Sequence, residues 1–315
     1  MRVIDNLAEI RQPFPRAVVT IGNFDGVHIG HQALLHTVTE KAETIGGTAV
    51  VLTFEPHPVR VLTHNGYPPL ITLRPQKIEL IEKAGIDVLV SIPFTREFAA
   101  VSARSFVIDI LLAKLGVTVL VVGQDYRFGK NREGNLNLLR SYAEAFDFEV
   151  VVVDWVPMSA DIPFRVSSTR IRELVMAGAV DDAQKLLGRF YQIRGRVTTG
   201  RQRGGRLLGF PTANIALSDE LCPKAGIYAV KVEWSGRLYN GVANIGYSPT
   251  FDDNDFTVEV HLMDFNESIY EQEIRINFVR RIRDEVKFEN LSALSEQIGR
   301  DVSAARDILT GSPSA

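Results

Sequence analysis

The first half of the chain alternates short β-rich apolar runs with helical segments, and this pattern limits the possible folds most strongly. Such alternation is typical of a parallel sheet whose strands are joined by crossover helices. The runs are almost continuously Val, Ile and Leu, which indicates a sheet buried on both faces. Right-handed crossovers then predict an open doubly wound α/β sheet, with a ligand site beyond the carboxyl ends of its strands. We predict strands at 17–22, 48–54, 87–92, 117–123 and 148–154, and helices at 28–45, 75–84, 103–115, 136–145 and 169–177.

The pattern changes near Leu187, where glycine-punctuated short strands replace the helical segments. Apolar and polar residues alternate over 256–262, which is typical of a strand with one buried face. Further strands are expected at 227–232, 238–245 and 273–279. A small antiparallel β-barrel is the expected architecture. Apolar residues recur at steps of three and four over 291–308, so a closing helix should pack on the barrel. We therefore divide the chain into domains 1–186 and 187–315.

The composition excludes several classes of protein. The chain has 315 residues, of which 45% are hydrophobic and 23% are charged, as in ordinary soluble proteins. Its formal net charge of -3 provides no overall attraction for nucleic acid or an anionic membrane. The single cysteine, Cys222, cannot form an intrachain disulfide, and no apolar run approaches the roughly 18 residues of a membrane span. We expect a cytoplasmic protein without nucleic-acid or membrane partners; the sequence does not specify its oligomeric state.

The segment from Gly22 to His31 follows the first predicted strand and opens the first predicted helix. A helix N-terminus offers unpaired N–H groups and partial positive charge to phosphate oxygens, and glycines allow close backbone approach. His28 and His31 are three residues apart on one helical face, where both rings could donate to a polyphosphate. The pair is also compatible with solvated histidines or a zinc site, although no cysteine cluster supplies a third ligand. The candidate site residues here are Gly22, Phe24, Asp25, Gly26, His28, Gly30 and His31.

Three further segments follow predicted strands. In 167–172, Ser167, Ser168 and Thr169 can cap a helix and offer hydroxyl and amide donors to an anion, and Arg172 adds a permanent positive charge. A capped helix with exposed arginines would show the same residues. His57 and Asp125 follow the second and fourth strands, in segments whose prolines and glycines are also ordinary in loops.

These segments together resemble a known superfamily. The string Gly-Asn-Phe-Asp-Gly-Val-His-Ile-Gly-His at 22–31 resembles the His-x-Gly-His motif of the nucleotidyltransferases, which class I aminoacyl-tRNA synthetases share. The Lys-Met-Ser-Lys-Ser-type loop of those synthetases is not found, whereas 167–172 resembles the Ser-Ser-Thr-x-Ile-Arg motif of small-metabolite adenylyltransferases. The segments around His57 and Asp125 resemble the adenylyltransferase half of bacterial FAD synthetases, the bifunctional riboflavin kinases. The resemblance implies a nucleotide site formed by these residues.

A loop rich in glycine and arginine, at 200–210, precedes Pro-Thr-Ala-Asn at 211–214. Such a loop can surround an anion with backbone N–H and guanidinium donors. Its candidate contacts are Gly205, Arg206 and Gly209. Thr212 and Asn214 are two residues apart, so on an extended segment both side chains face the same way, and their oxygens suit octahedral Mg²⁺. A turn linker with solvated arginines would have the same composition.

Glu259 is the candidate base of the second half. Phosphorylation of a primary alcohol needs an acceptor for its proton, usually a carboxylate. Glu259 lies on the predicted strand 256–262 and faces away from its apolar neighbours, a position at which a carboxylate is commonly only solvated. The 200–214 segment and this strand resemble the riboflavin kinase module, whose proposed base matches Glu259. Tyr228, in Gly-Ile-Tyr at 226–228, also resembles that module and is a candidate ligand contact.

The two modules occur in the order of the FAD synthetase family, so the resemblance implies a bifunctional enzyme. Its barrel would transfer the ATP γ-phosphoryl group to riboflavin, giving FMN. Its first domain would let the FMN phosphate attack the ATP α-phosphorus, giving FAD and pyrophosphate. The implied cofactor is Mg²⁺, with ATP as co-substrate. Two alternatives stay open: a tRNA-binding synthetase-like protein, which the net charge does not support, and a flavin- or nucleotide-sensing regulator without turnover.

Overall fold

The chain forms two compact units, Met1–Ser167 and Ser168–Ala315. The computed structural model describes residues 1–63, 68–159, 162–198, 212–215, 217, 219–247 and 256–311. Helices α7 (Ser168–Met176) and α8 (Val180–Leu187) belong to the second unit. The structural division therefore precedes the predicted boundary at 186/187, and the functional boundary stays a prediction.

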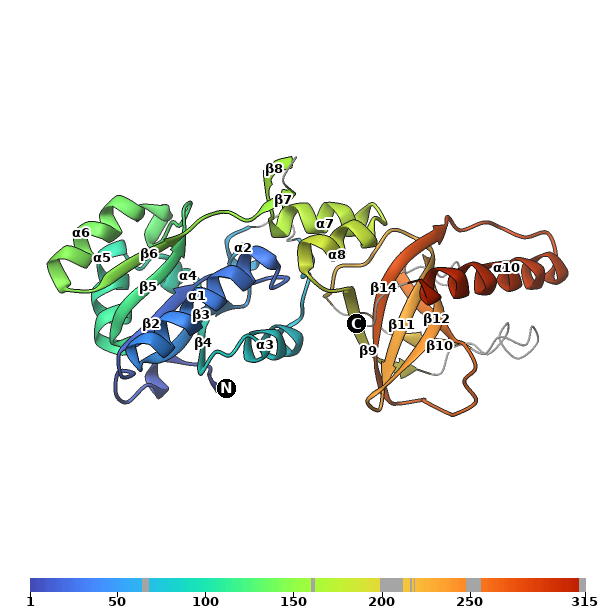
Figure 1. Cartoon of the computed structure of the whole chain (residues 1–315), viewed down its shortest axis with the longest axis horizontal. Helices are drawn as coiled ribbons and strands as arrows, with labels where there is room; N and C mark the ends of the chain where they lie inside the picture. The colour runs from blue at the N-terminus through green and yellow to red at the C-terminus, as the bar shows by residue number, and fades with distance from the viewer. Residues whose placement is uncertain are drawn as a thin grey trace. The chain divides into compact units, whose positions relative to one another are not determined.

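The first unit contains a parallel sheet with the strand order β1-β4-β3-β2-β5-β6 (Figure 1). All neighbouring strands run parallel, which confirms the doubly wound α/β fold. The strands are β1 (Arg2–Ile4), β2 (Ala17–Ile21), β3 (Thr48–Glu55), β4 (Val88–Pro93), β5 (Val117–Gly123) and β6 (Glu149–Val153). The helices are η1 (Leu7–Glu9), α1 (Ile29–Ile45), α2 (Pro58–Leu62), α3 (Arg74–Lys83), α4 (Arg96–Ala99), α5 (Ala103–Ser105), η2 (Phe106–Leu115), η3 (Lys130–Arg132) and α6 (Leu136–Phe146). A short pair, β7 (Pro157–Ser159) and β8 (Ile162–Arg165), follows β6.

The continuous apolar character of the strands follows from burial on both faces of the sheet. In β2, Val19 packs into one core, together with Leu111 of η2, while its neighbour Val18 packs into another, together with Leu35 of α1. Because successive side chains of a strand point to opposite faces, both faces need apolar residues. The region predicted as one helix over 103–115 consists of α5 followed by the π-helix η2.

The second unit contains a closed barrel with the strand order β10-β13-β12-β11-β14-β9 (Figure 1). Its neighbours are antiparallel, as predicted. The strands are β9 (Tyr191–Thr198), β10 (Ala213–Ile215), β11 (Gly226–Trp234), β12 (Arg237–Tyr247), β13 (Phe256–Leu262) and β14 (Glu273–Arg283). The sequence analysis missed β9, although Tyr191, Ile193 and Val197 alternate there with polar residues, the pattern of a strand with one buried face.

The closing helix α10 (Leu291–Thr310) packs outside the barrel through its C-terminal half. Ala305 and Leu309 share a core with Ala229 of β11. Arg283 at the end of β14 donates two hydrogen bonds to the Asp301 carboxylate, at 2.9 and 2.6 Å, which fixes the helix to the strand. The predicted apolar stripe is therefore confirmed only in part, since Leu291 at the start of the helix is 61% exposed.

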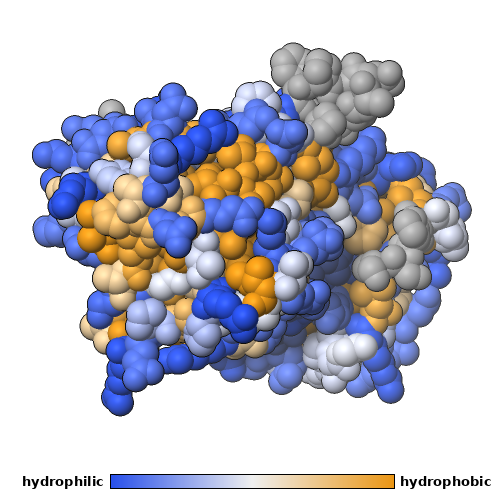
Figure 2. All heavy atoms as spheres, turned by 60° about the vertical axis from the view of Figure 1, so that its left-hand side comes forward, coloured by the Kyte–Doolittle hydropathy of each residue, from blue (hydrophilic) through white to orange (hydrophobic). Residues whose placement is uncertain are grey.

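The surface of the first unit also carries apolar side chains. Figure 2 shows them gathered on the face that is turned forward, interrupted by hydrophilic residues. Among the helices within the described ranges, none combines the length and apolar character needed to cross a membrane.

Candidate active sites

The order of the parallel strands places the first site. The chain runs from β2 to β3 on one side and later reaches β5 on the other side of β2, so β2 and β5 flank the point where the strand order reverses. Ligands of open α/β sheets bind beyond the carboxyl ends of the strands at such a point. The loops that begin at Gly22, after β2, and at Gln124, after β5, both start at this edge.

The two predicted histidines meet at the start of α1. The His28 and His31 rings stack with their centroids 3.6 Å apart and an interplanar angle of 15°. His28 is the N-cap residue of α1, and its Nδ1 accepts a hydrogen bond of 3.2 Å from the backbone N–H of His31. A neutral imidazole that accepts at Nδ1 carries its proton on Nε2. A Cβ on Gly30 would lie 3.2 Å from the His28 ring, so glycine gives the ring its space.

Buried side chains support the rest of the loop after β2. Phe24 is fully buried, lies edge-on to the His31 ring at 5.2 Å, and would be 3.2 Å from a Cβ on Gly22. Gly26 has a φ of +87°, a left-handed conformation that favours glycine. The structure thus places Phe24 and Gly26 as supports of the loop, and direct ligand contact by them stays a prediction.

Asp25 is also buried, with 4% of its surface exposed. Its Oδ1 accepts hydrogen bonds of 3.0 Å from the backbone N–H groups of Ile71 and Thr72. The Thr72 hydroxyl in turn accepts a 3.0 Å bond from the N–H of Gly26. These bonds tie the loop after β2 to the residues that precede α3.

His57 and Asp125 occupy comparable positions after their strands. His57 is the N-cap residue of α2, and its Nδ1 accepts a 3.3 Å hydrogen bond from the N–H of Val59. Asp125 follows β5 and forms an ion pair with Arg165, whose guanidinium lies 5.5 Å from the ring centroid of the exposed Trp155. The sequence motifs contained no indication of the Arg165 partner, because it lies forty residues further along the chain.

A group of phenylalanines at the same edge was missed by the motif analysis. Phe54 lies near the carboxyl end of β3, and Phe94 directly follows β4. Their ring centroids are 5.6 Å apart, and each lies 5.8 Å from the ring of Phe98 on α4. All three side chains are partly exposed. Aromatic residues just after apolar strands were the available signal, but single phenylalanines there are also typical of core packing.

The Ser-Ser-Thr-Arg-Ile-Arg segment lies where the two compact units divide. Ser167 ends the first unit, and Ser168 and Thr169 begin helix α7 of the second. Arg172 on the same helix is buried, with 9% exposed. The predicted helix start is therefore confirmed, while the ligand contacts of these residues stay predictions.

In the barrel, the predicted base and metal ligand are brought together across three strands. Asn214 of β10 pairs in register with Glu259 of β13, which pairs on its other side with Asn244 of β12. The residues flanking each of the three along its strand are buried, whereas these three are partly exposed. They therefore form one row on the outer face of the barrel, because paired residues share a face.

Asn244 was not among the predicted site residues. Its Oδ1 is buried and has no hydrogen-bond partner within the described part of the chain. Thr212, the other predicted metal ligand, is partly exposed and lies immediately before β10. This set of hydroxyl and amide oxygens beside a carboxylate fits a hard divalent cation. Gly205, Arg206 and Gly209 lie outside the described residues.

A second carboxylate, that of Glu285, lies beside the row. A Cβ on Gly246 would clash with Oε1 of Glu285, so a side chain at 246 would displace this carboxylate. Gly246 is two residues from Asn244 on β12 and therefore shares its face. Burial raises the pKa of Glu259, and the negative charge of Glu285 raises it further. Both causes make Glu259 a stronger base than an exposed glutamate.

Tyr228 lies in the barrel interior. Its ring is fully buried and lies edge-on to Phe278, with ring centroids 5.4 Å apart. Its hydroxyl donates to the backbone oxygen of Lys224. This environment gives Tyr228 a packing role, and a ligand contact by this residue stays a prediction.

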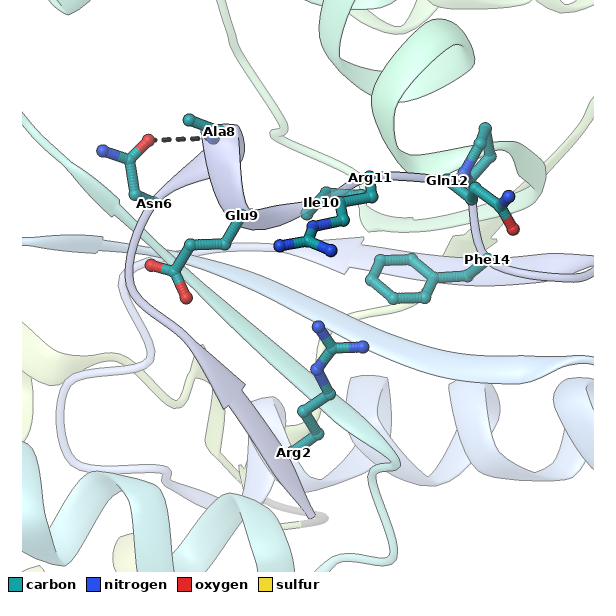
Figure 3. A pocket seen from close by; sticks show the side chains of 9 residues that line it. Arg2, Asn6, Ala8, Glu9, Ile10, Arg11, Gln12 and Phe14 are labelled. Carbon is teal, nitrogen blue, oxygen red and sulfur yellow. Dashed lines mark hydrogen bonds between the residues drawn. The ribbon is translucent and has the colours of Figure 1, made fainter.

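A pocket of about 1040 Å³ lies near the N-terminus, away from these motifs in the sequence. It is lined by Arg2, Asn6 and residues 8–14. Figure 3 shows the guanidinium groups of Arg2 and Arg11 and the ring of Phe14 directed toward one another. The residues that line it include none of the predicted site residues.

The two halves of the chain match two family models. Residues 11–170 match FAD synthetase, and residues 187–309 match riboflavin kinase. A nucleotidyltransferase-type sheet joined to a flavokinase barrel defines a class of flavin-cofactor-forming transferases. The chain belongs to the bifunctional riboflavin kinase/FMN adenylyltransferase family. It converts riboflavin to FMN with ATP and then adenylylates FMN to FAD, with release of pyrophosphate.

Curated relatives match over nearly the full length. The bifunctional riboflavin kinase/FMN adenylyltransferase of Haemophilus influenzae is 39% identical over 97% of this chain and 98% of its own length. The Escherichia coli K12 protein of the same name is 36% identical over 98% and 96%. A solved Streptococcus pneumoniae structure described as a macrolide-efflux protein is similar in fold, with a TM-score of 0.87 and 32% identity over 96% of this chain and 98% of that chain.

Proposed function

We propose that adenylyl transfer takes place beyond the carboxyl ends of β2 and β5. The observation that carries this proposal is the stacked His28–His31 pair at the N-terminus of α1. The partial positive charge of this helix N-terminus, its backbone N–H groups and the imidazole N–H donors together suit the ATP polyphosphate. The FMN phosphate attacks the ATP α-phosphorus, pyrophosphate leaves, and the histidines stabilise the negative charge on the transferred group. From the resemblance alone, His57, Asp125, Ser167, Ser168, Thr169 and Arg172 complete the nucleotide contacts.

The isoalloxazine ring of FMN packs on the group formed by Phe54, Phe94 and Phe98. Flat apolar rings suit aromatic surfaces in offset or edge-to-face contact. The three phenylalanines are partly exposed and lie at the carboxyl ends of β3 and β4, the sheet edge that carries the histidines. This arrangement supports binding of the flavin and the polyphosphate at one edge of the same sheet.

For the kinase reaction, Glu259 accepts the proton of the riboflavin 5′-hydroxyl as its oxygen attacks the ATP γ-phosphorus. The row Asn214–Glu259–Asn244 supports this role, because amide groups on both sides can hold the carboxylate and the substrate in place. Thr212 and Asn214 would hold Mg²⁺, which neutralises phosphate charge when bound. The Asn244 amide oxygen is a further acceptor for the substrate hydroxyl or a metal-bound water.

Removal of divalent metal is expected to stop FMN formation. When the full chain is incubated with riboflavin and ATP, chromatographic separation of the flavins should show FMN and FAD with Mg²⁺ present and only riboflavin with excess EDTA. Restoring Mg²⁺ should restore both products. Full FMN formation in EDTA would contradict the assignment of Thr212 and Asn214 as metal ligands.

The domain division can be tested with fragments. We expect a fragment of residues 187–315 to phosphorylate riboflavin, since the barrel and α10 form their own core. A fragment of residues 168–315 should unfold at a higher temperature, because α8 buries Val180, Ala183 and Leu186 in this unit. Thermal unfolding and a kinase assay check both fragments. An inactive but folded 187–315 fragment would move the functional boundary toward Ser168.

We further propose that the enzyme works in the cytoplasm, on small flavins and ATP, without nucleic-acid or membrane partners. The net charge of -3 and the single cysteine support this setting.

A further inference from the structure

A buried lysine lies next to the proposed polyphosphate loop. Lys77 on α3 has 7% of its surface exposed. Its Nζ lies 3.5 Å from Oε2 of Glu55, which ends β3 at the same edge of the sheet. Lys77 belongs to none of the sequence motifs, and its helix is otherwise an ordinary covering helix of the sheet.

The surroundings of Lys77 act on its pKa in both directions, and burial is the largest cause. Burial lowers the pKa of Lys77, and the nearby Arg74 acts in the same direction. The carboxylates of Glu55 and Asp25 act in the opposite direction and favour the ammonium form. A buried ammonium is costly unless it is paired, so this group is expected to have a specific role at its position.

The cluster is connected to the loop that follows β2. Asp25 lies within that loop, three residues before His28. Its carboxylate accepts the hydrogen bonds from Ile71 and Thr72, immediately before α3, the helix that carries Lys77. Lys77 therefore lies close to Glu55, which ends β3, and interacts electrostatically with Asp25, which follows the neighbouring strand β2.

Two carboxylates at this edge would repel an ATP polyphosphate. Coulomb interactions are stronger and less screened at partly buried positions than in water. Given the proposed polyphosphate position, we propose that Lys77 is a positioning residue of the adenylyltransferase site: its buried ammonium neutralises Asp25 and Glu55 and so allows the loop after β2 to accept ATP. Lys77 acts through these carboxylates and has no contact with the reacting atoms.

The test uses Lys77→Met, which keeps the length of the side chain and removes its charge, in the full chain. FAD synthesis from supplied FMN is measured over a range of ATP concentrations. We expect the KM for ATP to rise about 10- to 100-fold, as when supporting partners of a polar site are lost, with a much smaller change in kcat. Higher salt should reduce this defect, because it screens the repulsion. Lys83→Met on the same helix, where the side chain is 69% exposed, is the matched control and should behave as wild type.

A second variant separates charge from packing. Without Lys77, the carboxylates of Asp25 and Glu55 are no longer neutralised. Adding Glu55→Gln to Lys77→Met removes one of these two negative charges, so the KM for ATP should return most of the way to that of the Glu55→Gln single variant. An equal KM defect in Lys77→Met and the double variant, with no salt dependence, would overturn the proposal. So would an unchanged KM in Lys77→Met.

The barrel provides an internal measure of folding. Riboflavin kinase activity should be unchanged in all these variants, because Lys77 and Glu55 belong to the first unit. Lys77→Met could also lower the unfolding temperature of that unit. In that case Lys77→Arg, which keeps the charge, should retain the wild-type KM for ATP. A raised KM in Lys77→Arg would count against neutralisation of Asp25 and Glu55 by the charge at position 77. If His31→Ala left FAD formation unchanged, the polyphosphate site itself would be refuted. If His31→Ala stopped FAD formation but Lys77→Met left the KM for ATP unchanged, only this inference would be refuted.

Discussion

Replacing Glu259 by Gln is expected to lower riboflavin kinase turnover by about 10²–10⁴, the usual contribution of a positioned general base. The glutamine keeps the size of the side chain and its place between Asn214 and Asn244, but it cannot accept the riboflavin hydroxyl proton. Riboflavin and ATP binding should change far less. The measurement is FMN formation under saturating substrates, with KM determined separately.

The raised pKa of Glu259 adds a pH dependence to this prediction. The base is active only when it is ionised, so the wild-type kinase rate should fall as the pH decreases through a pKa above that of an ordinary glutamate. Glu285→Gln removes one cause of the raised pKa and should move this acid limb to lower pH. In Glu259→Gln the limb should be absent.

Two controls accompany the Glu259 variant. FAD synthesis from supplied FMN should persist, because its nucleophile is already an anionic phosphate. Glu273→Gln, at an exposed position at the start of β14, should leave kinase turnover unchanged. An unaltered kinase rate in Glu259→Gln would mean that Glu259 is only a solvated strand carboxylate and that water or the phosphate itself takes the proton.

His31→Ala is expected to stop FAD formation while FMN still accumulates. The His31 ring stacks on His28 and lies edge-on to Phe24, so its removal takes away a preorganised donor and frees the His28 ring. Loss of one such donor typically lowers the rate by about 10²–10³. The measurement is the ratio of FAD to FMN formed from riboflavin and ATP in a fixed time.

His36→Ala is the matched control for the histidine prediction. His36 lies on the same helix, with 72% of its side chain exposed and its Nε2 3.2 Å from the carboxylate of Glu40 one turn away. It should leave both activities unchanged. Equal loss of FMN and FAD formation in His31→Ala would show that the two activities are not separable, which would contradict separate sites in the two units.

The sequence by itself determined the two architectures and their order. In a buried parallel sheet both strand faces are apolar, so continuous runs such as 117–123 and 48–54 indicate the fold directly. In the barrel, alternation over 256–262 indicates one buried face and places Glu259 on the other. The histidine segment was equally local, because the strand, the turn and the helix N-terminus are consecutive in the chain.

Only the tertiary structure decided which distant residues join these motifs. Lys77 reaches Glu55 and Asp25 because α3 packs beside two strands, and Arg165 reaches Asp125 across forty residues. The register of three strands places Asn244 beside Glu259, and the segment after β14 brings Glu285 close to Gly246. Such contacts depend on strand order, register and helix packing, which involve residues far apart in the chain and therefore leave no local pattern in the sequence.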